Sequence, residues 1–168
     1  FFKNPTIRYA SYGIAALIIS LIHLVFLKFI SVEGLTPDIL LIFCVWVALR
    51  EGQFVGMFAG FACGILFDII TQDVIGTNAL SKTLVAFSAC WFYKRDSLDQ
   101  ILSSYKFLVI VLCTSLLHNL VYYFFYIKLS ELSFLPFFLK YGIAISLYTT
   151  VFAVIVMLAH IPSRRIKV

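Results

Sequence analysis

Apolar residues follow one another in long runs along this chain, and charged residues interrupt them only at intervals. Arg8 and Lys28 bracket nineteen uncharged residues, which is enough for a helix to cross a bilayer. The runs near 107–127 and 138–160 are also long enough, whereas Ile39–Leu49 has eleven residues and would span only about 16 Å as a helix. The pattern predicts six membrane segments, at approximately 9–29, 37–49, 53–70, 79–93, 107–127 and 138–160, and an amphipathic interfacial helix at 95–105.

These segments predict an all-α integral membrane protein with one transmembrane domain over residues 1–168. Three segments are long and three are short, which favours a compact six-helix bundle that partly encloses the short hairpin 37–49 and 53–70. The first apolar run is too long for a cleavable signal and lacks a cleavage site, so we expect it to remain as a membrane helix. The chain starts with Phe1 instead of Met, which is consistent with a trimmed start.

Glycine recurs at every fourth position of the third segment. Gly52, Gly56, Gly60 and Gly64 are followed by Asp68 at the next step. Residues four apart share a helix face, and each glycine inside a helix costs about 1 kcal/mol relative to alanine. In membrane helices that cost is offset where a groove of small residues lets another backbone approach closely. We therefore predict a helix-packing groove along these glycines, which receives either the neighbouring short segment of the same chain or a partner's helix.

Two carboxylates flank the short hairpin. Asp38 follows Thr36-Pro37, a triplet typical of a helix start. Asp68 ends the glycine segment, where a charge is costly unless protein or the water interface shields it. We expect Asp38 and Asp68 either to share an outward-facing polar pocket with nearby charges, or to act only as a helix cap and a headgroup-level residue. The candidates for a polar pocket or a partner contact are Asp38, Asp68, Asp73, Lys82, His118 and Asn119.

Catalysis has little support in the sequence. There is no HExxH, GxSxG or P-loop motif, and no histidine stands at metal-ligand spacing from a carboxylate. His118 and Asn119 form the most polar pair within a long span, and a hydrogen bond between helices is the role we expect for them. The cysteines lie in apolar segments without a CxxC pair and are expected to be small buried residues: Cys44, Cys63, Cys90 and Cys113. We therefore expect no enzymatic activity, no metal ion and no cofactor.

Composition excludes a soluble domain, because 62% of the residues are hydrophobic and only 12% are charged. The net charge of +5 is modest, and no Lys/Arg cluster interleaves with aromatic residues, so we expect no nucleic-acid partner. Six spans with an inside N-terminus give nine cytoplasmic cations: Lys3, Arg8, Arg50, Lys94, Arg95, Lys106, Arg164, Arg165 and Lys167. Four cations then face outward: Lys28, Lys82, Lys128 and Lys140. The positive-inside rule places both termini in the cytoplasm.

Several short motifs follow one another in a fixed order between residues 37 and 80. They are Pro37-Asp38, the turn Arg50-Glu51-Gly52, a GxxxGFxxGxxxD helix from Gly56 to Asp68, and Gly76 followed by Ala79-Leu80. In this combination the chain resembles the rod shape-determining protein MreD family, by motif over about residues 37–80 and by length and number of spans over the whole chain.

The resemblance implies a multi-pass protein of the bacterial inner membrane that belongs to the cell-elongation machinery. It implies binding to the single-span protein MreC and, with the actin homologue MreB and the cell-wall synthases, support of lateral wall growth. It also implies a fold similar to the substrate-binding subunits of energy-coupling-factor transporters. A vitamin-binding transporter subunit on that fold is therefore the alternative function, and the sequence leaves open whether the chain forms a homodimer.

Overall fold

The computed structural model describes residues 5–30, 35–72, 74–93, 98–128 and 134–160. Across these residues the chain is helical and contains no strand. The helices in chain order are α1 (Pro5–Ile30), α2 (Ile39–Glu51), α3 (Gln53–Thr71), α4 (Thr77–Ala89) with a 3-10 turn η1 (Cys90–Phe92), α5 (Leu98–Leu102), α6 (Tyr105–Lys128), α7 (Phe134–Phe137), a π-helical turn η2 (Phe138–Gly142) and α8 (Ile143–His160).

Four helical stretches in this part of the chain are long and apolar enough to cross a membrane. They are Pro5–Val25, Gln53–Thr71, Tyr105–Tyr126 and Phe134–Ala159. Helices α2 and α4 have 13 residues each, about 20 Å at 1.5 Å per residue, and fall short of the hydrocarbon core. A helix of that length is stable at membrane depth only if protein groups, not lipid, meet its ends.

Helix α2 lies at the centre of the molecule and packs against α1, α3, α4, α6 and α8. Eight of its thirteen residues are buried. The larger apolar cluster joins α2 to α4, α6 and α8 and includes Val45, Val85, Phe107 and Ala153. A smaller one joins α2 to α1 and α3. A short helix that is apolar on nearly all sides is thereby kept out of lipid.

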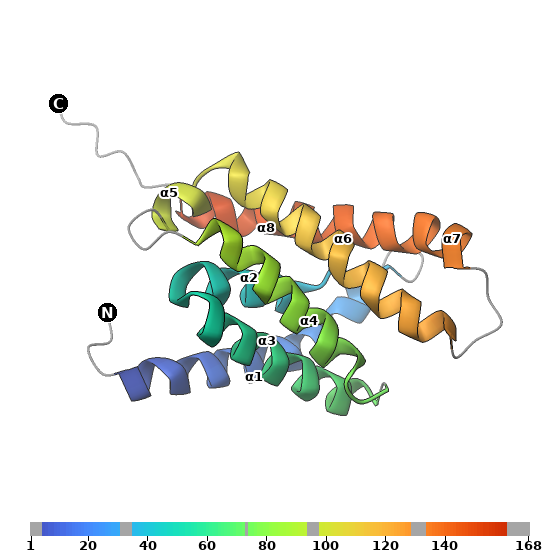
Figure 1. The fold of residues 1–168 in the computed structure, drawn as a ribbon, viewed down its shortest axis with the longest axis horizontal. Helices are drawn as coiled ribbons and strands as arrows, with labels where there is room; N and C mark the ends of the chain where they lie inside the picture. The colour runs from blue at the N-terminus through green and yellow to red at the C-terminus, as the bar shows by residue number, and fades with distance from the viewer. Residues whose placement is uncertain (1–4, 31–34, 73, 94–97, 129–133, 161–168) are drawn as a thin grey trace.

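The long helices surround this centre in two groups. Helices α1 and α3 lie on one side and α6 and α8 on the other, with α4 crossing between them (Figure 1). The start of α1, the α2–α3 turn, α5 and the end of α8 lie at one end of the molecule (Figure 1). The α3–α4 loop and α7 lie at the other end.

Three details differ from the sequence expectations. Helix α4 begins at Thr77, two residues earlier than expected. Of the interfacial helix expected at 95–105, residues 98–105 are described, and only Leu98–Leu102 form a separate helix, α5, whose Leu102 is buried against the core. All four cysteines were expected to be buried, but Cys113 is exposed on α6 and Cys90 is only partly buried.

Candidate functional site

The turn between α2 and α3 closes one end of the molecule. Gly52 there has a φ of +87°, a backbone conformation that favours glycine, so it belongs to the turn and not to the packing groove predicted from the sequence. Beside it, the Glu51 carboxylate forms an ion pair with Arg8 at 2.9 Å and accepts a hydrogen bond from the Tyr12 hydroxyl at 2.7 Å. These contacts fix the start of α1 to the hairpin.

The other three glycines of the predicted groove lie against this chain's own helices. A Cβ added at Gly56 would lie 2.8 Å from Cα of Ala48 on α2, and one at Gly60 would lie 2.6 Å from the carbonyl oxygen of Lys82 on α4. At Gly64 it would collide with the backbone of Ala79, also on α4. Of the two occupants left open by the sequence, the same chain occupies the groove, and α4 covers more of it than α2.

Asp68 joins the end of α3 to the start of α4. Its carboxylate is fully buried and accepts hydrogen bonds from the backbone N–H groups of Gly76 at 2.8 Å, Asn78 at 3.2 Å and Ala79 at 3.4 Å. A negative charge at a helix N-terminus satisfies free N–H groups and is favoured by the helix dipole. Asp68 is therefore a cap supplied by another helix, and protein groups, not water, shield its charge.

Asp38 caps α2, which is one of the two roles considered from the sequence, and it also contacts side chains of other helices. Its Oδ1 accepts a hydrogen bond from the N–H of Leu41 at 2.8 Å and so caps α2. Its Oδ2 lies 2.7 Å from Nζ of Lys82 and 3.5 Å from Nε2 of His118. Its own N–H donates to Oγ1 of Thr149 at 3.0 Å. One residue thus links α2 to α4, α6 and α8.

Lys82 is the other centre of this cluster and is fully buried. Its ammonium group donates to Asp38 and, at 3.1 Å, to Oδ1 of Asn78, one turn earlier on α4. It also lies 4.9 Å from the centre of the Phe67 ring, close enough for a cation–π interaction. A buried charge is tolerated only when paired and hydrogen-bonded, and these three partners meet that condition.

The predicted polar pocket therefore exists only as a buried cluster. Asp38 and Lys82 are in direct contact, and Asp68 is linked to Lys82 through Asn78, which bonds both. None of these side chains lines either of the two grooves described in the structure, since helices cover Lys82, Asn78 and Asp68 and the Asp38 side chain is only 13% exposed. Asp73 lies outside the described residues. Asn78 and Thr149 were missed from the sequence, although Asn78 stands four residues before Lys82 and so on the same face.

His118 and Asn119 are neighbours in sequence but belong to different contacts. His118 faces the Asp38–Lys82 pair, whereas Nδ2 of Asn119 donates to the carbonyl oxygen of Gly142 at 3.2 Å and to Oγ of Ser146 at 2.9 Å. Asn119 thus fixes α6 to the π-helical turn and α8. Within the described ranges, Nδ1 of His118 and Nδ2 of Asn78 have no hydrogen-bond partner.

The family model of the rod shape-determining protein MreD matches residues 6–163, nearly the whole chain. Among curated proteins and among solved structures, none matches. The match confirms the resemblance that the ordered motifs indicated, and it extends through the second half of the chain, where the sequence offered no sharp motif. This chain belongs to the rod shape-determining protein MreD family, a family of multi-pass membrane proteins that act in rod-shape determination.

Proposed function

We propose that this protein is a non-enzymatic scaffold of the cell-elongation machinery in the bacterial inner membrane. In this role it binds MreC and helps couple the MreB cytoskeleton and the cell-wall synthases to peptidoglycan synthesis. The observation that carries the proposal is the family match over residues 6–163. It is supported by the chemistry of the interior, where the charged residues pair with one another and cap helices.

The proposal includes a six-helix bundle with both termini in the cytoplasm. In this arrangement α2 and α4 count as short crossings enclosed by the four long helices. The start of α1 and the end of α8 lie at the same end of the molecule, which supports an even number of membrane crossings (Figure 1). Burial of Lys82 in the cluster removes it from the outward-facing cations, leaving three from the sequence against nine inward, and so strengthens the charge bias.

A membrane scaffold acts through helix faces that lipid or a partner can contact. Helix α3 exposes Phe54, Phe58 and Phe61, and α8 exposes Val151 and Ile155. Helices associate in lipid through van der Waals packing and interhelical hydrogen bonds and not through a hydrophobic driving force. The partner surface is expected on one of these two sides of the molecule.

A photo-crosslinking experiment tests the proposal. A photoreactive residue is placed at Phe58 on α3, at Val151 on α8 and, as a buried control, at Val45 on α2. We expect an adduct with MreC from one of the exposed positions and none from Val45. If the folded protein is extracted in mild detergent and no MreC is bound to it, the proposal is contradicted.

The same preparation distinguishes the scaffold function from that of a vitamin-binding transporter subunit. Native mass spectrometry of the extracted protein is expected to show an MreC adduct and no bound vitamin, whereas a stoichiometric vitamin would support the transporter subunit. We also expect Asp68→Ala to weaken MreC binding and to impair the rod shape of the cells, because the substitution loosens the contact between α3 and α4. Insertion into the membrane should not be prevented. Unchanged MreC recovery and cell shape in this variant would contradict a role for Asp68.

A further inference from the structure

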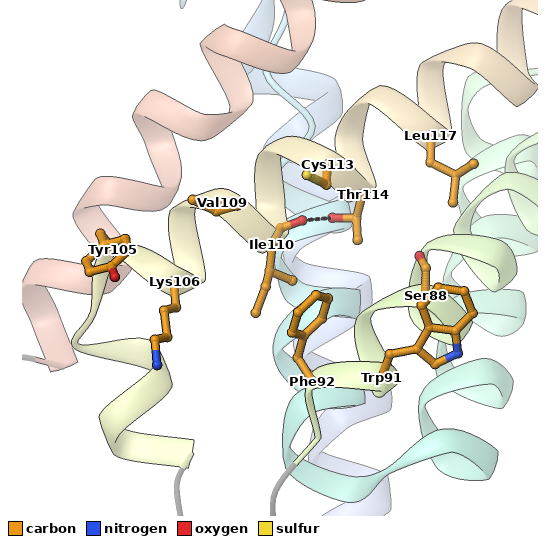
Figure 2. Close-up of a pocket in the computed structure, with 10 residues that line it drawn as sticks. All are labelled: Ser88, Trp91, Phe92, Tyr105, Lys106, Val109, Ile110, Cys113, Thr114 and Leu117. Atoms are coloured by element: carbon orange, nitrogen blue, oxygen red, sulfur yellow. Dashed lines mark hydrogen bonds between the residues drawn. The ribbon is translucent and has the colours of Figure 1, made fainter.

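A groove of about 650 Å³ runs along the surface between α4 and α6, away from the ion-pair cluster. Figure 2 shows its lining, with Trp91 and Phe92 of η1 on one side and α6 from Tyr105 to Leu117 on the other. Two hydroxyl groups in the lining, of Ser88 and Thr114, donate to carbonyl oxygens of their own helices. The side walls are therefore mainly apolar, and these two hydroxyl groups are already hydrogen-bonded within their own helices.

The length of this α4–α6 groove matches one leaflet of a bilayer. Lys106 and Leu117 are eleven residues apart on α6, or about 16 Å along the helix axis. Half of the hydrocarbon core of a bilayer is about 15 Å. A groove that starts at the interface and ends near the midplane suits a single hydrocarbon chain.

Charge is confined to one end of the groove. Lys106 is exposed there, and no carboxylate in the described part of the chain forms an ion pair with its ammonium group. Tyr105 is 71% exposed at the same end, and tyrosine is typical of the membrane–water interface, whereas Trp91 lies further along the groove beside Ser88 (Figure 2). Figure 2 shows Lys106 and Tyr105 at one end of the lining and Leu117 at the other.

We propose that the α4–α6 groove binds one acyl chain of an anionic phospholipid, with the lipid phosphate at Lys106. Basic sites between membrane helices on the cytoplasmic side favour anionic headgroups, and each lysine near the surface contributes about fivefold in affinity. The inference depends on the membrane location of the protein and not on its binding to MreC, so the two can fail separately.

Trp91 provides a direct probe, because the chain has two tryptophans and the other, Trp46, is replaced in Trp46→Phe. The variant is reconstituted in phosphatidylcholine vesicles that contain a small fraction of either brominated phosphatidylglycerol or brominated phosphatidylcholine. We expect brominated phosphatidylglycerol to quench Trp91 fluorescence as though enriched about fivefold at the groove. In Lys106→Gln, the ratio of Trp91 quenching by brominated phosphatidylglycerol to quenching by brominated phosphatidylcholine should fall to about one.

Lys140→Gln is the matched control, since Lys140 is an exposed lysine on η2, at the opposite end of the molecule, and the variant should keep the wild-type ratio. Native mass spectrometry repeats the comparison with Trp46 intact, counting phosphatidylglycerol retained by the wild type, Lys106→Gln and Lys140→Gln. Equal quenching by the two lipids in the parent variant, or equal retention in all three proteins, overturns the proposal. So does a polypeptide found crosslinked in the groove in place of lipid.

Discussion

Lys82 is fully buried, although it is a long and charged side chain. Its ammonium group has left water, and its pairing with Asp38 at 2.7 Å and with Asn78 at 3.1 Å offsets that cost. Well-packed apolar replacements of a whole buried ion pair are often neutral, but removal of one member leaves an uncompensated charge. The two partners should therefore be strongly coupled in their effect on stability.

We expect Lys82→Met to lower the free energy of unfolding by about 3–5 kcal/mol, because the Asp38 carboxylate is left buried without its cation. The double variant Lys82→Met/Asp38→Asn should recover much of that loss, since asparagine is a good helix cap and carries no charge. Denaturation of the detergent-solubilised protein measures both. Lys140→Met, at an exposed lysine, should change little. A double variant less stable than Lys82→Met would contradict strong coupling.

Substitution by alanine should change the stability of the protein in opposite directions at two glycines of the membrane helices. An added methyl group at Gly64 meets the Ala79 backbone, so Gly64→Ala must push α3 and α4 apart, at a cost of about 1–3 kcal/mol or more. At Gly13 on α1, no heavy atom lies within 4 Å of the added Cβ. Gly13→Ala should therefore raise stability by up to about 1 kcal/mol. Thermal unfolding in one detergent compares the pair, and a Gly64→Ala protein as stable as wild type would exclude close packing there.

At the scale of helices, the ends that carry local signals could be predicted. Thr36-Pro37-Asp38 marked the start of α2, and the charged turn before Gly52 marked its end, because capping and turn geometry depend on neighbouring residues. The groove could be predicted from the spacing of its glycines, but its occupant could not. Which helix lies on Gly60 depends on tertiary packing, and spacing along one helix carries no information about that.

The polar cluster shows the same limit. Asp38 and Lys82 are 44 residues apart, and only the fold brings them to 2.7 Å. Lys82 stands near the start of a short segment, so hydropathy alone favours an outward position near the interface. The capping role of Asp68 could not be predicted either, since the backbone N–H groups that it caps belong to the start of the next helix. Contacts within one turn are readable from a sequence, and contacts between helices are not.

Asp68→Ala should loosen the first turn of α4, because it removes the acceptor of three backbone N–H groups. Hydrogen bonds to a charged group contribute about 1.5–3 kcal/mol each, so the local loss should be at least about 2 kcal/mol. Hydrogen exchange followed by mass spectrometry should then show faster exchange over residues 76–79. Asp68→Asn keeps one acceptor oxygen, so its exchange over residues 76–79 should be faster than in wild type and slower than in Asp68→Ala. Asp99→Ala, an exposed change on α5, should leave residues 76–79 protected as in wild type, and equal protection in Asp68→Ala would refute the capping role.

The whole molecule has an apolar core that contains one buried polar cluster, and its exterior is also largely apolar. One residue, Asp38, joins helices from both halves of the chain through its carboxylate and its backbone N–H, and the large exposed side chains of α1 and α3 face outward. Such a body suits a protein that keeps one shape while its surface contacts lipid and other helices. Its orientation then decides which partners it can reach, since cytoskeletal and cell-wall components lie on opposite sides of the membrane.

The distribution of lysine and arginine predicts that the end carrying α5 faces the cytoplasm. Single cysteines at Gln100 on α5 and at Val74 in the α3–α4 loop, both exposed, test this in a background where Cys90 and Cys113 are replaced by alanine. A membrane-impermeant maleimide added to intact spheroplasts should label Val74→Cys. It should label Gln100→Cys only after the membrane is permeabilised, because α5 lies at the opposite end of the molecule (Figure 1). The reverse pattern would place the termini outside, and labelling of both positions from one side would mean that the helices between them do not cross the membrane an odd number of times.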